Sequence, residues 1–88
     1  MKLLDYEGNK PVFTTIHVAK NNAPVTYFSV DEEGDFQAFS EHESKIEETM
    51  LISLSHLLTI EPSLKIITDL HPGAEYHKDL ISSEWLKS

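Results

Sequence analysis

The chain has 88 residues, with 15 acidic side chains against seven lysines and no arginine, a net charge of −8, and it contains no cysteine. This length fits one domain over residues 1–88, and a chain that is 40% hydrophobic and 25% charged has the composition of a globular protein rather than a disordered one. The lack of cysteine excludes disulfides, thiolate metal sites and a cysteine nucleophile and fits a reducing compartment, so we expect a cytoplasmic protein. The scarcity of basic residues argues against nucleic acid as a direct ligand.

The hydrophobic residues are not arranged for a membrane or for secretion. The longest apolar-rich stretch, Met50 to Ile60, is interrupted by polar residues and is too short to span a bilayer. At the N-terminus, Asp5 and Gly8 come before any apolar run of the length that a signal peptide needs. We therefore expect neither membrane insertion nor secretion.

The first half of the chain predicts three strands. Pro11 to Ala19 is rich in β-branched residues, and Val25 to Val30 and Asp35 to Phe39 are shorter strand-like runs. Lys20 to Pro24 is a turn by composition, and the glycine of Asp31 to Gly34 can take the positive φ that closes a tight loop. Because consecutive strands joined by turns tend to pair, we expect an antiparallel three-stranded meander.

The sequence leaves two local structures open. Phe36 and Phe39 fall on opposite faces of a regular strand, which requires either a bulge or partial cover of the sheet on both sides. From Ile46 onward the apolar spacing fits one long helix, whereas Thr49 to Ile52 also fits a short buried strand followed by a helix capped by Ser53. Just before this region, Ser44-Lys45-Ile46-Glu47 matches a capping box.

The last third of the chain predicts a helix, a strand and a fastened tail. Pro62 to Leu70 is expected to be helical because proline suits a first helical position, and His71-Pro72-Gly73 ends the helix. Ala74 to Lys78 is a final strand, and Trp85 is expected to hold the tail of the chain against the body. The predicted fold is therefore α+β: an antiparallel sheet, made of the N-terminal meander and a C-terminal strand, with two short helices packed on one face.

Acidic residues gather in segment 31–48, which holds eight acids and one lysine, a local charge of −7. Several carboxylates around one tight loop are the ligands that calcium prefers. The EF-hand pattern fails in either register, since starting at Asp31 puts Phe36 where glycine is needed and starting at Ser29 puts Ser40 where the bidentate glutamate belongs. We therefore expect a solvated acidic loop and no metal or other cofactor.

The chain carries no recognisable catalytic motif. Its five histidines lack the spacing of a zinc site, and Ser53 and Ser63 stand where helix starts need a hydroxyl rather than in a nucleophile motif. Three scattered glycines build no phosphate-binding loop. We therefore expect no enzyme, and the one set that suggests a small-ligand or metal site is His71 to His77, with Glu75 and Tyr76, if these side chains converge.

Several short motifs occur in a recognisable order. They are Asp31-x-x-Gly34-Asp35-Phe36-Gln37-x-Phe39, Leu51-Ile52-Ser53-Leu54, Glu61-Pro62-Ser63-Leu64, Asp69-Leu70-x-Pro72-Gly73 and Trp85. This order, over about residues 25 to 86, resembles a group of small, mostly uncharacterised bacterial proteins of the DUF2185 type, some of which are thought to be immunity proteins of polymorphic toxin systems. The resemblance implies helices packed on one face of an antiparallel sheet, favours the strand-then-helix interpretation of residues 49–60, and supplies no catalytic residue.

The functional prediction is a non-enzymatic protein-binding module, of the immunity type that the resemblance implies, which uses its acidic surface to bind a basic protein or toxin domain. The alternatives are a self-associating domain, a homodimer rather than a monomer, which pairs through an uncovered sheet edge, and the small-ligand or metal-binding domain. The residues expected to contact a partner are Asp31, Glu32, Glu33, Asp35, Phe36, Glu41 and Glu43, with Phe36 or Phe39 as the aromatic anchor.

Overall fold

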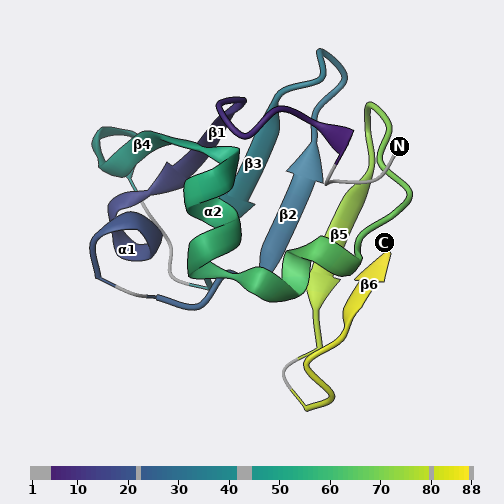
Figure 1. Ribbon diagram of the computed structural model, residues 1–88. Coiled ribbons are helices and arrows are strands. Elements are labelled where there is room, and N and C mark those ends of the chain that lie inside the picture. The colour runs from purple at the N-terminus through teal and green to yellow at the C-terminus, as the bar shows by residue number, and fades with distance from the viewer. Residues whose placement is uncertain (1–4, 22, 42–44, 80, 88) are drawn as a thin grey trace.

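The computed structural model describes residues 5–21, 23–41, 45–79 and 81–87. These residues form a mixed α+β fold with a six-stranded sheet (Figure 1), which confirms the predicted fold class. Within them, no helix is long and apolar enough to cross a bilayer. In chain order the elements are β1 (Pro11–Thr15), α1 (Ile16–Ala19), β2 (Tyr27–Val30), β3 (Phe36–Phe39), the 3₁₀ helix η2 (Ile46–Glu48), β4 (Thr49–Ser53), α2 (Leu54–Ile60), the 3₁₀ helix η3 (Pro62–Ile66), β5 (Glu75–Lys78) and β6 (Trp85–Lys87).

The strands lie in the order β4-β1-β3-β2-β5-β6, and the predicted three-stranded meander is wrong in detail. Strand β1 pairs with β3 in parallel and with β4 antiparallel, so β3 separates β1 from β2. The predicted first strand ends at Thr15, because residues 16–19 turn into α1. The chain between β1 and β2 is therefore too long for a tight hairpin, and β1 is free to take other neighbours.

The hairpin between β2 and β3 is confirmed. Its loop is closed by Asp31, whose Oδ1 accepts hydrogen bonds from the backbone N–H groups of Glu33 and Asp35, each at 2.9 Å. Gly34 takes a φ of 90°, a left-handed conformation that glycine adopts without a steric penalty. Phe36 and Phe39 lie on opposite faces of β3, and both faces carry some cover, since Phe36 is fully buried and Phe39 half-buried.

Residues 49–60 form a strand and then a helix, as the second of the two interpretations predicted. Strand β4 ends at Ser53, whose Oγ accepts a hydrogen bond from the backbone N–H of His56 at 3.1 Å and so caps α2. Ahead of β4, the N–H of Lys45 donates to Glu48 Oε1 at 2.8 Å. The reciprocal contact of this turn thus uses Glu48 in place of the predicted Glu47, and Ser44 lies outside the described residues.

The predicted helix over residues 62–70 is shorter than expected. Proline does stand at its start, but the segment is the single 3₁₀ element η3 and ends at Ile66, where Ile67 N–H donates to Leu64 C=O at 3.1 Å. Leu70 is buried without being helical, because the extended segment after η3 still runs along the core. The predicted final strand is present as β5.

One face of the sheet holds the hydrophobic core. In Figure 1, α2 and η3 lie across this face, and α1 lies beside the end of the sheet that carries β1 and β4. Tyr6 packs edge-on against Phe36 with 4.8 Å between ring centroids, and Phe28 packs edge-on against the same ring at 5.4 Å. The core consists of Val12, Val18, Val25, Phe28, Val30, Phe36, Ala38, Ile52, Leu54, Leu57, Leu64, Ile67, Leu70, Ala74, Tyr76 and Trp85.

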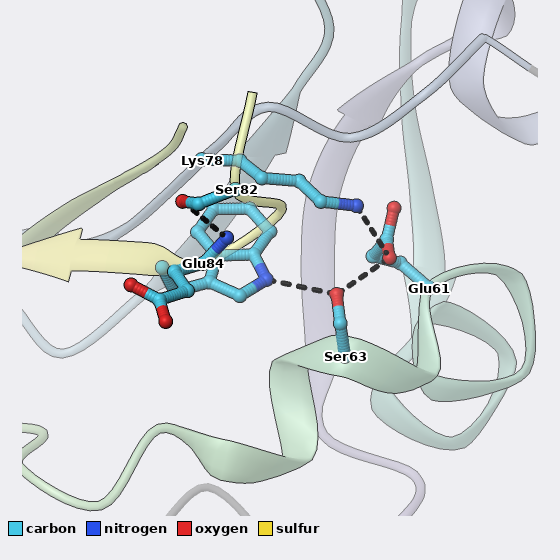
Figure 2. A network of polar contacts seen from close by, with 6 residues as sticks. Glu61, Ser63, Lys78, Ser82 and Glu84 are labelled. Carbon is cyan, nitrogen blue, oxygen red and sulfur yellow. Dashed lines mark hydrogen bonds and ion pairs between the residues drawn. The ribbon is translucent and has the colours of Figure 1, made fainter. Parts of the chain in front are cut away.

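A chain of polar contacts fastens the C-terminal strand to the helical layer. The indole N–H of Trp85 donates to Ser63 Oγ at 2.9 Å, and Ser63 Oγ donates to Glu61 Oε2 at 2.6 Å. Lys78 Nζ pairs with the same Glu61 oxygen at 3.2 Å, which Figure 2 shows from close by. The predicted role of Trp85 is confirmed: its ring is buried, and its polar edge is held by η3.

We call the opposite face of the sheet the open face. Alternation along the strands places Phe13, Gln37 and Leu51 in one cross-strand row of this face. A second row contains Phe39, Tyr27, His77 and Leu86. Exposed fractions of 36% for Phe13, 57% for Leu51 and 40% for Leu86 show that apolar side chains on this face reach solvent.

Candidate functional site

The open face contains a hollow of about 350 Å³ where β2 lies between β3 and β5. Three carboxylates, those of Asp31, Glu32 and Glu75, belong to its lining, and no lysine does. We call this feature the acidic hollow. Its full lining is Tyr27, Ser29, Val30, Asp31, Glu32, Gln37, Gly73 and Glu75.

Strand pairing brings these residues together from three separate segments. Ser29 of β2 lies opposite Gln37 of β3 on one side and opposite Glu75 of β5 on the other. The pairing with the last segment continues beyond β5, because Val30 exchanges backbone hydrogen bonds with Gly73 and Ala74 at 2.8 and 2.9 Å. The walls of the hollow are therefore fixed by the sheet itself.

Two hydrogen bonds orient the polar side chains of the hollow. Tyr27 donates its hydroxyl proton to Glu75 Oε1 at 3.0 Å, and Ser29 Oγ donates to Gln37 Oε1 at 3.2 Å. Ser29 is almost fully buried, whereas Glu75 is exposed, so the floor of the hollow is shielded and its rim carries the charge. Carboxylate oxygens at the rim can therefore accept hydrogen bonds from a group that enters the hollow.

The pKa of Tyr27 is raised above its ordinary value. Burial is the main cause, and the hydrogen bond to Glu75 and the charge of that carboxylate act in the same direction, while the contact with Ser29 opposes them. A raised pKa keeps the phenol protonated at neutral pH. Tyr27 is therefore a hydrogen-bond donor to Glu75 under ordinary conditions.

Apolar side chains adjoin the acidic hollow on the same face. The rings of Tyr27 and Phe39 stack across β2 and β3, with 6.3 Å between centroids and an interplanar angle of 15°. In the neighbouring cross-strand row, Phe13 of β1 lies beside Gln37, and Leu51 of β4 lies beside Phe13. A carboxylate-lined hollow beside exposed aromatic and aliphatic surface is a combination that protein interfaces use.

The structure separates the acidic residues that the sequence placed in one segment. Asp31 and Glu32 line the hollow, and Glu33 and Asp35 lie in the same loop, where Glu33 is exposed and Asp35 half-buried. Glu41 follows the far end of β3, because the strand runs away from the loop, so it does not join this group. Glu43 lies outside the described residues.

Phe36 is not available to a partner. Its ring is completely buried in the core on the face that α2 and η3 cover, so its assignment as a contact residue is corrected. The reason is its alternation with Gln37, which places Phe36 and Ala38 inward and Gln37 and Phe39 on the open face. Phe39 is the aromatic side chain of this strand that a partner can reach.

Tyr27, Gln37 and Glu75 belong to the hollow, although the sequence did not point to them as contact residues. Tyr27 and Gln37 carry a usable signal, since each alternates with core residues along a predicted strand. Glu75 alternates with Ala74 and Tyr76 in the same way, but only the pairing of β5 with β2 brings it beside Tyr27 and Ser29.

The alternative ligand site over residues 71–78 is not assembled. Tyr76 lies on the core face and donates to the backbone C=O of Asp69 at 2.5 Å, while Glu75 and His77 lie on the open face. His71 Nδ1 contacts Pro72 C=O at 3.0 Å. Among the described residues, no three histidine or carboxylate side chains lie close enough together to hold a metal ion.

Near this segment an ion pair fixes the end of the chain. Lys87 Nζ donates to Asp69, and it also lies 3.3 Å from His71 Nε2. The hydrogen bond and charge of Lys87 lower the pKa of Asp69, and Asp69 in turn raises the pKa of Lys87. Both groups are exposed, so the pair positions β6 without adding much to stability.

A second hollow, of about 370 Å³, lies beside α2, with Pro24, His56, Thr59 and Glu61 in its lining. Its polar groups are largely engaged elsewhere: Thr59 Oγ1 donates to Ser55 C=O at 3.0 Å, and Glu61 holds Ser63 and Lys78. The acidic hollow, whose lining includes three carboxylates, is the stronger candidate.

Comparison with known proteins adds no assignment: the chain matches no family model, no curated protein and no solved structure. The resemblance to immunity-type proteins therefore stays a prediction.

Proposed function

We propose that this protein is a non-enzymatic binding module that docks a basic segment of another protein onto its open face. The observation that carries the proposal is the acidic hollow, where carboxylates from two segments far apart in sequence, Asp31–Glu32 and Glu75, surround one concavity beside the stacked rings of Tyr27 and Phe39. An acidic surface alone serves solubility; a concave acidic site next to reachable apolar surface matches a cationic side chain and its neighbours.

The chemistry of the hollow suits a lysine or arginine side chain. The ammonium or guanidinium group would find the oxygens of Glu32 and Glu75, and its apolar stem would lie along the Tyr27 ring. Glu75 already accepts one hydrogen bond from Tyr27 and keeps its second oxygen for a ligand. Apolar residues that flank the basic side chain would pack on Phe39 and Phe13.

The charge of the whole molecule supports the same partner class. A net charge of −8 attracts basic proteins from a distance and repels acidic ones, which raises the association rate at low salt. A basic toxin domain, the class that the resemblance implies, has the required charge, and binding to it would make the protein an immunity factor.

The engagement of the hydroxyl groups supports a non-enzymatic role. Ser53 caps α2, and Ser63 bridges Trp85 and Glu61, so both oxygens serve the fold. Tyr27, with its raised pKa, is a poor proton acceptor at neutral pH.

A pull-down with charge-matched variants tests the proposal. We compare the wild type with Glu32→Lys/Glu75→Lys, which reverses two carboxylates of the hollow, and with Glu47→Lys/Glu84→Lys, which makes the same change in net charge at exposed sites elsewhere. Partners from the native lysate are quantified by mass spectrometry. We expect a basic protein to be retained by the wild type and the control and lost from the hollow variant.

Two results would count against the proposal. A partner that both variants lose equally responds to net charge and not to the hollow. A partner that both variants retain equally binds elsewhere on the molecule. Circular dichroism of each variant confirms that the comparison is made between folded proteins.

A further inference from the structure

Strand β4 forms one edge of the sheet, and no other described strand lies along its outer side. Exposed edges usually carry charged residues or proline that prevent pairing with another chain. The five residues of β4, Thr49-Met50-Leu51-Ile52-Ser53, contain neither. Leu51, at the centre of the strand, leaves 57% of its surface exposed.

The hydrogen-bond pattern shows which backbone groups of β4 point outward. Leu54 N–H donates to Lys10 C=O at 2.9 Å, which places this pair at a hydrogen-bonded position of the antiparallel ladder with β1. Bonding alternates along such a ladder, so Met50 and Ile52 also direct their N–H and C=O groups toward β1. Thr49, Leu51 and Ser53 direct theirs toward the free edge.

Two of these six outward groups are already used within the chain. Thr49 N–H donates to Ile46 C=O at the end of η2. The C=O of Ser53 accepts the first hydrogen bond of α2, as the carbonyl of an N-cap residue does. The groups that remain are the C=O of Thr49, the N–H and C=O of Leu51, and the N–H of Ser53.

We propose that β4 pairs with β4 of a second copy of this chain, antiparallel and around a two-fold axis at Leu51. In this register Leu51 exchanges two hydrogen bonds with Leu51 of the second copy, and each Ser53 N–H donates to Thr49 C=O across the axis. The four remaining groups of each copy therefore all find hydrogen-bond partners on the other copy. Thr49 N–H and Ser53 C=O, which are already bonded within the chain, lie opposite each other across the axis. This self-complementarity favours a second copy over an unrelated strand.

The distribution of charge permits this contact in a strongly acidic protein. Residues 49–60 contain no acidic residue and no lysine, although the chain carries a net charge of −8. In the proposed register Glu48 faces Leu54, so no like charges meet across the axis. The two Leu51 side chains lie side by side on the open face, with Phe13 behind each. The acidic hollow is separated from β4 by β1 and β3, so either proposal can fail without the other.

Sedimentation velocity over a wide concentration range tests the dimer. We expect the wild type to associate to a dimer, and Leu51→Lys, which sets two like charges at the axis, to weaken the association by about tenfold or more. Leu86→Lys is the matched control, because Leu86 is exposed on the same face at the opposite edge strand β6. This variant should dimerise like the wild type.

Amide hydrogen exchange at low and high protein concentration shows whether the backbone pairs. We expect the amides of Leu51 and Ser53 to exchange more slowly in the dimer, and the amide of Thr49, bonded to Ile46 in either state, to change little. A wild type that stays monomeric overturns the proposal. It is equally overturned by a dimer that Leu51→Lys leaves intact, or by one in which Leu51 and Ser53 gain no protection.

Discussion

Thr14 of β1 is completely buried, and its Oγ1 has no hydrogen-bond partner within the part of the chain that the structure describes. A buried hydroxyl without a partner carries a desolvation penalty, and removing it while keeping the shape of the side chain relieves that penalty. We expect Thr14→Val to raise the free energy of unfolding by about 1 kcal/mol, measured by urea denaturation.

A matched control for this prediction is Thr68→Val, because Thr68 is exposed and its hydroxyl is free to contact water. Its unfolding free energy should stay within about 0.5 kcal/mol of the wild type. If Thr14→Val destabilises the protein, the hydroxyl has a partner in solution and the premise is wrong.

Tyr27 reports directly on the electrostatics of the acidic hollow. Its pKa is raised, so the protonated phenol contributes stability below its ordinary pKa, and that contribution is lost as pH rises through the folded-state pKa. Glu75→Gln removes the negative charge but leaves the burial. We expect the pKa of Tyr27 to fall toward its ordinary value in this variant, as followed by NMR titration of the tyrosine rings.

Tyr76 serves as the internal reference in the same titration. Its pKa is also raised, mainly by burial, and Glu75 is not among the causes. Its titration should therefore be nearly the same in Glu75→Gln and in the wild type. Equal shifts at both tyrosines would show a global change in place of a local one.

At the level of elements, the contacts around Ser63 decide how firmly β6 is held. Ser63→Ala leaves the indole N–H of Trp85 without its acceptor in a partly buried position. We expect a loss of about 1–2 kcal/mol in unfolding free energy and a shift in the fluorescence of Trp85, the only tryptophan. The fluorescence signal therefore comes from Trp85 alone.

Ser82→Ala provides the comparison, since Ser82 lies in the same C-terminal hairpin and is exposed: its Oγ accepts a long 3.4 Å contact from Glu84 N–H (Figure 2), and its hydroxyl also contacts the Asp79 carboxylate. Its stability and fluorescence should remain close to those of the wild type. A loss in Ser82→Ala as large as that in Ser63→Ala would mean that the hairpin, and not the Trp85 contact, sets the effect.

The elements that the sequence predicted well are those with local causes. The β2–β3 hairpin follows from Asp31 and Gly34, and the start of α2 follows from Ser53, so each depends on residues within one turn. The position of β1 in the sheet has no such local cause, because its pairing with β3 and β4 depends on residues far along the chain. The strand propensity of residues 16–19 was misleading for the same reason: their packing beside β4, and not their β-branched side chains, decides their conformation.

The candidate site shows the same limit at the scale of the whole molecule. The acidic character of residues 31–35 was readable from composition, and the open face gathers part of that charge into a concave site. The separation of Glu41 from this group follows from the direction of β3, and the arrival of Glu75 follows from the β2–β5 pairing. Neither is a property of a local sequence window.

The two faces of the sheet differ in what they contribute to the molecule. The core face holds the fold together through α2, η3 and Trp85, whereas the open face carries Tyr27, Phe39 and the acidic hollow. In the proposed complex the attraction is partly between exposed charges, so binding should weaken as salt is raised. The apolar neighbours of the hollow should preserve some affinity at moderate salt.

The most direct test of the central claim is an NMR titration of the ¹⁵N-labelled protein with a synthetic peptide that contains lysine, arginine and flanking aliphatic residues. We predict that the largest amide shifts fall on Tyr27, Ser29, Gln37, Gly73 and Glu75 and disappear in Glu32→Lys/Glu75→Lys. Shifts centred on Glu41, Glu47 and Glu48, or spread evenly over all acidic residues, would contradict the account, because they would show that the peptide responds to charge and not to the hollow.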